Sequence, residues 1–340
     1  MVPNLNGERW IVPLCESLST AIGGLGSDDV EVILVDDCST DTSVATFQEF
    51  SAHHKNFRLL QNPRNIGWSG AVNRGVAASL GDPILVFSND MLVDPASIRT
   101  MVNVFRTTPS IALAQFNSRS LLNPTDQDSG MNYLDRFGYA YSRLPTSGIG
   151  DVFFAEGMAF AMRRSLIGSV GLLDDSYFME YDDMDYSWRV QLMGYRVVFI
   201  PDAVVFHARG GTVGRTYFNR RLQNIESYTR NHILTLGKNY ALGNALISVG
   251  VVGAVELAKS ALLAIRGSGS IARANVKGLF SGIAMLPNRS AERRRVQVTR
   301  TIDDKRILRR MHPFDPLELV AFLQHQAVDA RHFVPLQDRR

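Results

Sequence analysis

Short apolar runs that end in polar turns constrain the fold of this chain more than any other feature. Residues 31–35 are followed by Asp36 and Asp37, and residues 84–87 are followed at a short distance by Asp90. Similar runs, separated by segments with helical spacing, lie at residues 58–60, 111–115 and 196–200. Strands that alternate with helices build βαβ units. We therefore predict an α/β fold with a largely parallel central sheet, whose ligands bind at the carboxyl ends of the strands.

The apolar pattern also predicts the remaining elements. Helices are expected over residues 70–78, 96–106 and 183–193. The strand over residues 196–200 is expected to stop at Pro201, because proline cannot donate to a β-ladder. Residues 116–150 are polar, show no clear period and are expected to form a long functional or mobile loop.

After about residue 215 the pattern becomes helical, with helices expected over residues 217–238 and 241–266. This change predicts a first domain over residues 1–215 and a helical, basic region over residues 216–340. Within the first domain, a division is expected between residues 1–115 and residues 116–215, where the polar segment begins.

Composition excludes several classes of protein. A chain of 340 residues suggests two domains at about 150 residues each, and 45% hydrophobic residues exclude intrinsic disorder. Cys15 and Cys38 are its two cysteines, which is too few for a disulfide framework and typical of the cytoplasm. The chain does not open with a basic segment and an apolar run, so no secretory signal is expected.

Positive charge is concentrated near the C-terminus. Residues 259–310 hold 13 Lys and Arg against 3 Asp and Glu. This segment is either a solvated helical surface or a contact for an anionic partner, such as a membrane surface or a lipid-linked phosphate. Nucleic acid is not expected, because aromatic residues do not alternate with the charges. The uncharged residues 239–255 just before it are open to three interpretations: a membrane-spanning helix, a helix in the membrane plane, or a packed helical lid.

Common catalytic motifs are absent from the sequence: a P-loop, a dinucleotide-binding glycine pattern after a strand, and a G-x-S-x-G elbow. What remains is a set of carboxylates at strand ends and at a helix start. Each one also has a structural interpretation: Asp36 as a helix cap, Asp90 as a turn residue, and the aspartates of residues 182–185 as partners of a helix dipole. Their order along the chain is more specific than any one of them.

That order resembles glycosyltransferase family 2, the inverting enzymes with the GT-A fold. Residues 35–41 resemble the family motif V-D-(N/D)-x-S-x-D, and residues 65–75 resemble N-x-G-(F/W)-x-x-A-x-N-x-G. Residues 87–90 stand where the family has a metal-binding D-x-D. Residues 171–189 resemble its G-x-F-D-E and E-D-x-D-x-x-x-R segments, and His207 follows the next strand. Residues 228–232 resemble the Y-x-x-R-N segment of the rhamnosyltransferase-like branch.

The resemblance implies a nucleotide-sugar donor and a divalent cation, Mg²⁺ or Mn²⁺, that neutralises the departing diphosphate. It also implies that residues 1–115 bind the nucleotide and that residues 116–215 carry the acceptor and catalytic part. It assigns the metal to Asp90 and His207, although a lone histidine also serves as a structural hydrogen-bonding group. Arg74 could pair with phosphate or be a solvated helix residue. The residues that the resemblance implies for donor binding are Pro3, Asn6, Asp36, Asp37, Asn65, Gly67, Arg74, Asn89 and Gly157.

Catalysis is assigned by the same resemblance to Asp183, as the base that deprotonates an acceptor hydroxyl, with Asp182 beside it. Asp182 stands where the family has Glu, which leaves the reach of that side chain open. Asp185 and Arg189 are expected to brace this helix, and Trp188 to lie in the core. The first strand is expected to lack residues ahead of Pro3, so we expect the natural start to lie upstream.

These features predict an inverting, metal-dependent glycosyltransferase of cell-surface polysaccharide synthesis, with dTDP-rhamnose as the expected donor and a glycan or lipid-linked hydroxyl as the acceptor. The expected location is the cytoplasm or the cytosolic face of the membrane. A sugar nucleotidyltransferase would need a triphosphate loop that is absent from the sequence. The remaining alternative is a binding protein that kept the fold without the catalysis, which would bind the donor without transferring its sugar.

Overall fold

Three parallel strands begin the fold of the computed structural model, which describes residues 1–23, 25, 30–208 and 217–315. Strands β1 (Val2–Asn4), β2 (Val32–Asp36) and β3 (Phe57–Gln61) pair in that order. They are linked by the helices α1 (Glu8–Ile22), α2 (Ser43–Ala52) and α3 (Gly67–Ala78), the last of which follows β3. Both faces of β2 are covered, which explains its unbroken apolar sequence. Val32 and Leu34 pack with residues of α1 and α2, while Ile33 and Val35 pack with residues of α3.

A second, mixed sheet continues from the first. Its strands are β4 (Ile84–Phe87), β5 (Met91–Val93), β6 (Ile111–Ser120), β10 (Ala159–Met162) and β11 (Arg196–His207). They lie in the order β4-β10-β6-β11-β5, with β9 (Gly150–Asp151) on β11 and with α4 (Ser97–Thr107) packed against β11. β6 and β11 pair in parallel, whereas the other pairs are antiparallel. The amine of Met1 donates to Leu85 O at 2.6 Å, which joins the two sheets. The predicted α/β class is confirmed. Parallel pairing of β1, β2 and β3, and of β6 with β11, brings the carboxyl ends of the paired strands to the same edge of each sheet.

Proline 201 does not end its strand as predicted. β11 runs on to His207, and its register with β6 shifts between Ile200 and Val204. A β-bulge tolerates a residue without an N–H, because the bulged residues leave the ladder. The prediction was wrong because a single proline does not reveal a bulge. The continuation is important for function, since it carries His207 to the edge of the sheet.

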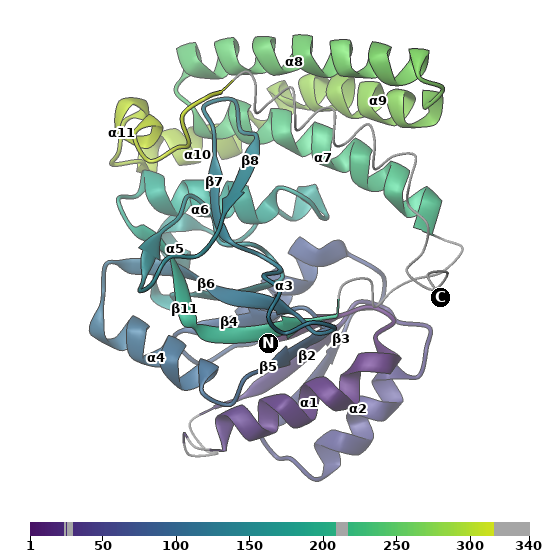
Figure 1. The fold of residues 1–340 in the computed structure, drawn as a ribbon, viewed down its shortest axis with the longest axis vertical. Helices are drawn as coiled ribbons and strands as arrows, with labels where there is room; N and C mark the ends of the chain where they lie inside the picture. The colour runs from purple at the N-terminus through teal and green to yellow at the C-terminus, as the bar shows by residue number, and fades with distance from the viewer. Residues whose placement is uncertain (24, 26–29, 209–216, 316–340) are drawn as a thin grey trace.

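The predicted loop over residues 116–150 is also wrong in part. β6 extends to Ser120, and strands β7 (Met131–Leu134) and β8 (Ala140–Arg143) form a separate antiparallel hairpin. These strands are four residues long, β7 buries the adjacent Met131 and Asn132, and β8 is half-buried to exposed, so apolar and polar residues do not alternate along the hairpin. In Figure 1 the hairpin rises from the sheets toward the upper helices.

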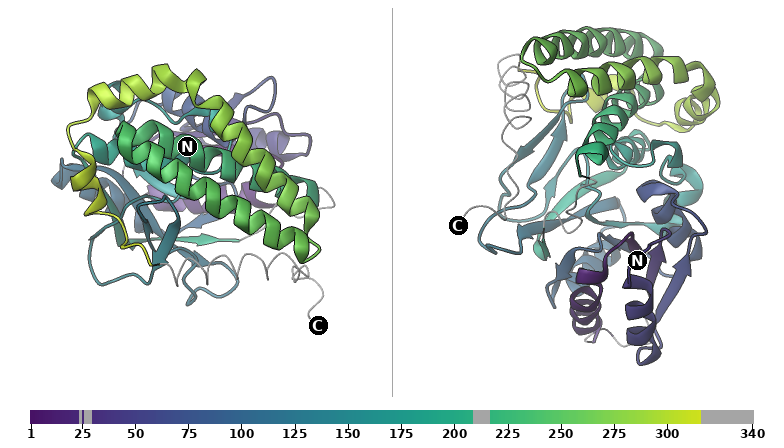
Figure 2. Two further views of the ribbon diagram at one scale, coloured as in Figure 1. Left: turned by 90° about the horizontal axis from the view of Figure 1, so that it is seen from above. Right: turned by 90° about the vertical axis from the view of Figure 1, so that its right-hand side faces the viewer.

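Helices form the second half of the chain. The catalytic part closes with η2 (Arg164–Leu166), α5 (Ile167–Val170), η3 (Asp175–Tyr177) and α6 (Asp182–Leu192). The C-terminal elements are α7 (Tyr217–Asn239), α8 (Leu242–Ile265), α9 (Gly269–Met285), η4 (Pro287–Arg289), α10 (Ser290–Thr299) and α11 (Asp304–Leu308). α7 packs on α6 and carries α8 and α9 above it (Figures 1 and 2). The predicted domain boundary at residue 215 and the predicted helical region beyond residue 315 lie outside the described residues.

The apolar run over residues 239–255 belongs mostly to α8. In the part of the chain that the structure describes, α8 is the one helix long and apolar enough to cross a membrane, and 28% of its most apolar 18-residue window is buried. It packs against α7 and α9 through one face and leaves the other exposed. Length and composition alone do not establish a membrane-spanning helix. In the structure, α8 is packed against other helices of the protein.

Candidate active site

Asn4, which the sequence analysis did not select, links the polar ends of β1, β2 and β4. Its Nδ2 donates to Asp36 Oδ1 at 3.0 Å, and its Oδ1 accepts from Asn89 Nδ2 at 2.8 Å. Asp36 also accepts from the Ser39 N–H at 3.1 Å. Gly7 packs on this cluster, since a Cβ there would lie 2.3 Å from Asn4 Oδ1. The predicted residues Asp36 and Asn89 therefore share one hydrogen-bonded cluster at the carboxyl edge of the sheet.

Asp37 holds the start of α3 in place. Its carboxylate accepts from Asn62 Nδ2 at 2.8 Å and from the backbone N–H groups of Ile66 and Gly67, each at 2.9 Å. These contacts engage both oxygens of a buried side chain. Asp37 thus anchors the neighbouring Asn65, whose exposed side chain accepts from the Gly67 N–H at 2.9 Å.

Gly67 permits a close backbone approach, as predicted, but the observed partner is protein. Its φ is +79°, and a Cβ would lie 2.5 Å from the ring of Phe178. The Ser69 N–H donates to Phe178 O at 3.3 Å. Gly67 therefore brings the start of α3 against the segment that precedes α6. The role predicted for Gly67 in donor binding stays a prediction.

Three other residues that were predicted to bind the sugar donor lie around this edge, and each contacts other parts of the protein. Pro3 is buried in β1, opposite Val35. Asn6 has φ +53° and accepts from the Thr40 N–H at 2.8 Å. Arg74 donates to Gln61 O at 2.6 Å and to the side chain of Asn62, so it ties α3 to the end of β3. Each therefore has an observed structural partner, and contact with a donor phosphate stays a prediction for Arg74.

The predicted metal ligands Asp90 and His207 meet at the edge of β5 and β11. His207 Nε2 lies 3.3 Å from Asp90 Oδ2, and His207 Nδ1 lies 2.9 Å from Asp128 Oδ2. Burial raises the pKa of Asp90, but the hydrogen bond and the charge of His207 outweigh it and leave the pKa below its ordinary value. Burial lowers the pKa of His207, but the two carboxylates outweigh it and raise the pKa to about 9.

This pair fits a hard divalent cation when His207 releases its Nε2 proton, which the raised pKa opposes and a bound cation would favour. Oδ1 of Asp90 is buried and accepts no hydrogen bond within the described residues, so one oxygen ligand is available. Asp128, which the sequence analysis missed, holds the ring of His207 through its other nitrogen, as carboxylates often do for histidines that bind a metal. Within residues 1–23, 25, 30–208 and 217–315, no cluster of three acidic, His or Cys side chains forms a complete metal site. Mg²⁺ and Mn²⁺ sites that also use substrate phosphates need only one or two protein ligands.

The predicted catalytic pair begins α6. Asp183 is half-buried, its Oδ2 accepts from the Gly157 N–H at 2.8 Å, and its Oδ1 accepts from the Met184 N–H at 2.7 Å. Burial raises the pKa of Asp183 despite these hydrogen bonds. Burial and the adjacent Asp183 raise the pKa of Asp182 well above its ordinary value. Gly157 therefore orients the predicted base through its N–H.

Backbone contacts link the predicted base to the predicted metal ligands. Met158, next to Gly157, accepts through its carbonyl from the Ser88 N–H at 2.8 Å. Ser88 immediately precedes Asn89 and Asp90 at the end of β4. Two backbone steps therefore connect the carboxylate of Asp183 to the predicted donor and metal residues.

Two further carboxyls that the sequence analysis missed lie near Asp183. Burial raises the pKa of Glu156, and repulsion from Asp183 adds to the rise. Burial and Asp183 together raise the pKa of Glu180 to about 7. Glu156 directly precedes Gly157, and Glu180 lies two residues before the pair Asp182 and Asp183. Their closeness to the predicted base was the signal in the sequence that could have identified them. Carboxyls with raised pKa values are suited to hold or exchange protons at neutral pH.

The segment that leads into α6 has a strained backbone. Phe178, Glu180 and Tyr181 have φ values between +64° and +69°, which are unusual for residues with a Cβ. Buried Asn231 of α7 stabilises this segment, because its Nδ2 lies 3.1 Å from Tyr177 O and 2.8 Å from each of the carbonyls of Met179 and Glu180. The predicted segment 228–232, which lies in the C-terminal region, therefore helps to hold the backbone that leads into α6. Strain of this kind is characteristic of functional sites.

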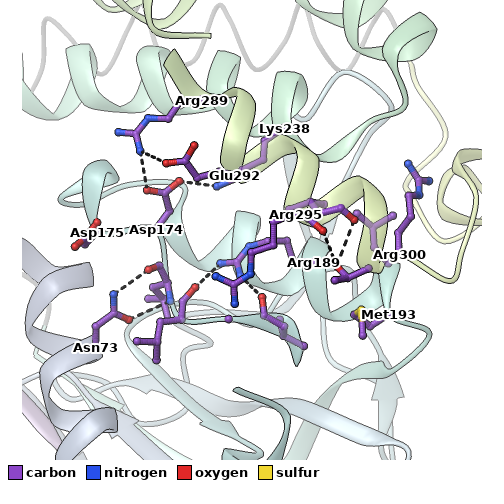
Figure 3. A pocket seen from close by; sticks show the side chains of 17 residues that line it. Asn73, Asp174, Asp175, Arg189, Met193, Lys238, Arg289, Glu292, Arg295 and Arg300 are labelled. Carbon is purple, nitrogen blue, oxygen red and sulfur yellow. Dashed lines mark hydrogen bonds and ion pairs between the residues drawn. The ribbon is translucent and has the colours of Figure 1, made fainter. Parts of the chain in front are cut away.

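A buried ion-pair network connects α6 to α7, and Figure 3 shows Arg189, Lys238 and Asp174 of this network. Arg189 Nε donates to Asp185 Oδ2 at 2.9 Å, as predicted for a bracing pair. Lys238 Nζ of α7 lies 3.0 Å from Asp185 and 2.7 Å from Asp174. Burial raises the pKa of Asp174, but Lys238 outweighs it and lowers the pKa to about 2. Trp188 is fully buried, which confirms its expected place in the core.

The fold and this edge of polar side chains define a transferase of nucleotide-linked sugars. The sequence model for glycosyl transferase family 2 matches residues 1–171, half of the chain, and the chain belongs to this family. It is therefore a family 2 glycosyltransferase with a GT-A fold. The matched range ends before Asp182 and Asp183.

Curated relatives and solved structures agree with the assignment. The N-acetylglucosaminyl-diphospho-decaprenol L-rhamnosyltransferase of Mycobacterium tuberculosis is 28% identical over 223 residues, which cover 55% of this chain and 69% of the relative. The poly-beta-1,6-N-acetyl-D-glucosamine synthase of Staphylococcus epidermidis is 22% identical over 209 residues, covering 60% of this chain and 49% of the relative.

Two solved structures share the fold. GalNAc-T7 with UDP, GalNAc and Mn²⁺ has a TM-score of 0.58 at 15% identity, and the match covers 70% of this chain and 47% of that one. The mannosyltransferase PcManGT from Pyrobaculum calidifontis, in complex with GDP-Man and Mn²⁺, has a TM-score of 0.53 at 16% identity. That match covers 83% of this chain and 85% of the other.

Proposed function

We propose that this chain is an inverting, metal-dependent glycosyltransferase of cell-surface glycan synthesis. One observation supports the proposal: the Asn4–Asp36–Asn89 cluster is adjacent to Asp90, which pairs with His207, and the segment that orients Asp183 is hydrogen-bonded to the same end of β4 through Met158 and Ser88. A donor at this edge would have its diphosphate near Asp90 and its sugar toward Asp183. Both solved structures named above hold a nucleotide and Mn²⁺, which supports a donor and a cation of these classes.

Asp183 is the proposed general base. It would accept the proton of the acceptor hydroxyl while that oxygen forms a bond to the anomeric carbon. The nucleoside diphosphate leaves from the opposite face with the electron pair of the broken C–O bond, so the anomeric configuration inverts. The raised pKa makes Asp183 a stronger proton acceptor than an ordinary carboxylate, and Gly157 fixes its orientation.

Asp90 and His207 would hold Mg²⁺ or Mn²⁺, and a cation there would neutralise the charge that develops on the departing diphosphate. The available Oδ1 of Asp90 would face the cation, and Asp128 would keep the ring of His207 in place. Asp36 would accept hydrogen bonds from the nucleoside. Asn4 orients Asp36 for this contact.

The proposed sugar is rhamnose, with dTDP-rhamnose as the donor and a lipid-linked or glycan hydroxyl as the acceptor. The Mycobacterium tuberculosis relative is named for rhamnosyl transfer to a diphospho-decaprenol acceptor, which supports this choice. Lipid-linked acceptors are embedded in a membrane. We therefore also propose that the enzyme works in the cytoplasm, at the cytosolic face of the membrane.

Asp183→Asn tests the catalytic assignment. The amide keeps the shape of the side chain but cannot accept the hydroxyl proton, so turnover should fall about 10³-fold. The thermal shift produced by the bound nucleotide with Mn²⁺ should persist, because the donor residues are intact. The donor is first identified by the same shift, across UDP, dTDP, GDP and CMP nucleotides with and without Mn²⁺.

Asp175→Asn is the matched control, since Asp175 is an exposed carboxylate in the preceding η3 and should tolerate the change. Normal turnover by Asp183→Asn would refute the base assignment. A nucleotide-induced shift without sugar transfer by the unmodified chain would favour the binding-protein alternative.

A further inference from the structure

The helix α8 has its apolar side on the outside. Leu246 is 66% exposed and Ile265 is 84% exposed, at opposite ends of the same face. The other large apolar residues exposed on this helix are Leu242, Ile247, Val251, Leu257 and Leu262. Surface helices of globular proteins normally bury their apolar face and expose the polar one. A continuous apolar stripe of this length therefore needs a partner.

The polar residues of α8 are used inside the protein. Buried Glu256 accepts from Asn275 Nδ2 of α9 at 2.8 Å and from Tyr139 OH at 3.3 Å, and it forms an ion pair with Lys259. Ser260 accepts from Asn275 at 2.9 Å. Glu256 and Lys259 are the two charged residues of α8, and they pair with each other. The exposed face of the helix therefore carries no formal charge.

Cations line one edge of the apolar stripe. A groove of about 610 Å³ lies between α8 and α9, with apolar walls that include Leu257 and Phe280. Arg273 and Lys277 of α9 border it, and Lys277 is 72% exposed although it pairs with Glu226 at 2.9 Å. Figure 2 shows α8 and α9 together on the outermost layer, with α7 between them and the sheets. Apolar side chains beside Lys and Arg match the interface of an anionic bilayer.

A membrane-spanning arrangement does not fit these contacts. Crossing the bilayer would place Glu256 and its network in the hydrocarbon region or separate α8 from α9. A second copy of the chain fits less well than a bilayer, because the outer face of α8 in that copy would offer Arg273 and Lys277 no acidic partner. Anionic lipid headgroups offer the complementary charge.

We propose that the outer face of α8, with the Arg273 and Lys277 edge of α9, is the surface on which this enzyme lies in the plane of an anionic membrane. The inference rests on the proposed membrane association and names the surface responsible. It places the helices α8 and α9 against the lipid and keeps the catalytic edge of the sheets in the aqueous phase. Its test measures binding to vesicles rather than sugar transfer, so it can fail or succeed independently of the donor assignment.

The experiment is flotation of the full chain with vesicles of phosphatidylcholine alone or with about 30% phosphatidylglycerol, at low and high salt. The unmodified protein should float with the anionic vesicles at low salt. Leu246→Asp/Leu257→Asp should reduce the bound fraction about tenfold or more, because it places charge in the apolar stripe. Arg273→Glu/Lys277→Glu should abolish the preference for anionic vesicles.

Leu80→Asp/Leu144→Asp is the matched control, since these leucines are exposed elsewhere on the molecule and should leave flotation unchanged. Unaltered melting temperatures and nucleotide-induced thermal shifts would show that every variant is folded. Equal flotation of unmodified protein and Leu246→Asp/Leu257→Asp would overturn the proposal. So would a dimer in solution that becomes a monomer in this variant without any loss of vesicle binding, which would assign the stripe to a second copy.

Discussion

At the scale of single residues, the site depends on side chains that hold other side chains. Asn4 orients Asp36 and Asn89, Asp37 fixes the start of α3, and Gly157 orients Asp183. The sequence motifs indicated the acidic residues of this set. They did not reveal which oxygens are already engaged by the protein, because that depends on partners distant in the chain.

Gly67→Ala should destabilise the protein and weaken donor binding. The new methyl group would clash with Phe178 and would also sit at φ +79°. Strain and overpacking together should lower the free energy of unfolding by about 3 kcal/mol. Urea unfolding and nucleotide-induced thermal shifts measure the two effects.

Gly148→Ala is the control for that experiment, since Gly148 has φ +89° but open space around it. It should carry the backbone strain alone, about 1 kcal/mol. Equal losses from the two substitutions would mean that the contact with Phe178 has no part in the effect.

At the scale of elements, the segment between η3 and α6 is shaped from outside the sheet. Its three positive φ values persist because α7 supplies the side chain of Asn231. His232 adds to this support by stacking on Tyr181, with ring centroids 4.9 Å apart. Helix α7 of the C-terminal region therefore fixes the backbone that leads into α6, the helix that carries the predicted base.

Asn231→Asp should impair turnover although Asn231 is not proposed to touch the substrate. Aspartate has the same shape but cannot donate to the three carbonyls, and the free energy of unfolding should fall by about 3 kcal/mol. The maximal rate with the donor identified by thermal shift should fall more than its KM rises, because the change displaces Asp183 and leaves the nucleotide residues intact.

Asn288→Asp serves as the comparison, since Asn288 is exposed in η4. A loss of stability in Asn231→Asp with no change in the maximal rate would reduce Asn231 to a purely structural role.

At the scale of the whole molecule, the C-terminal helices and the catalytic domain are joined by buried polar contacts. Lys238 bridges Asp174 and Asp185, and His232 Nε2 donates to Phe137 O at 2.6 Å. Burial lowers the pKa of His232 to about 4, and nearby Lys259 acts in the same direction, whereas Glu256 and the hydrogen bond to Phe137 oppose the shift. The junction between the two regions is therefore sensitive to acid.

The contribution of His232 to the stability of the chain should be lost as the pH falls from about 6.5 to 4. The unfolded state protonates His232 near pH 6.5, while the folded state resists protonation until about pH 4. The unfolded state thus binds more protons, and about 2 kcal/mol of unfolding free energy should be lost between pH 7 and pH 5 through this residue.

His232→Gln should remove that part of the pH dependence in urea unfolding at pH 7, 6 and 5. The same substitution at exposed His53 should preserve it. Identical slopes for His232→Gln and the unmodified protein would refute the role assigned to His232.

The sequence by itself determined the α/β class, the helices α3, α4, α6, α7 and α8 and the strands β2, β3 and β4 to within a few residues, and the family of the acidic motifs. It could do so because apolar periodicity and turn residues act locally, so they are readable without the fold. The bulge after Ile200, the β7–β8 hairpin and the partners of Asp37, Asp90 and Asp183 were decided only by the tertiary structure. These features depend on contacts between residues far apart in the chain. For the same physical reason, composition showed that α8 is apolar, whereas packing against α7 and α9 decided which of its faces remains exposed.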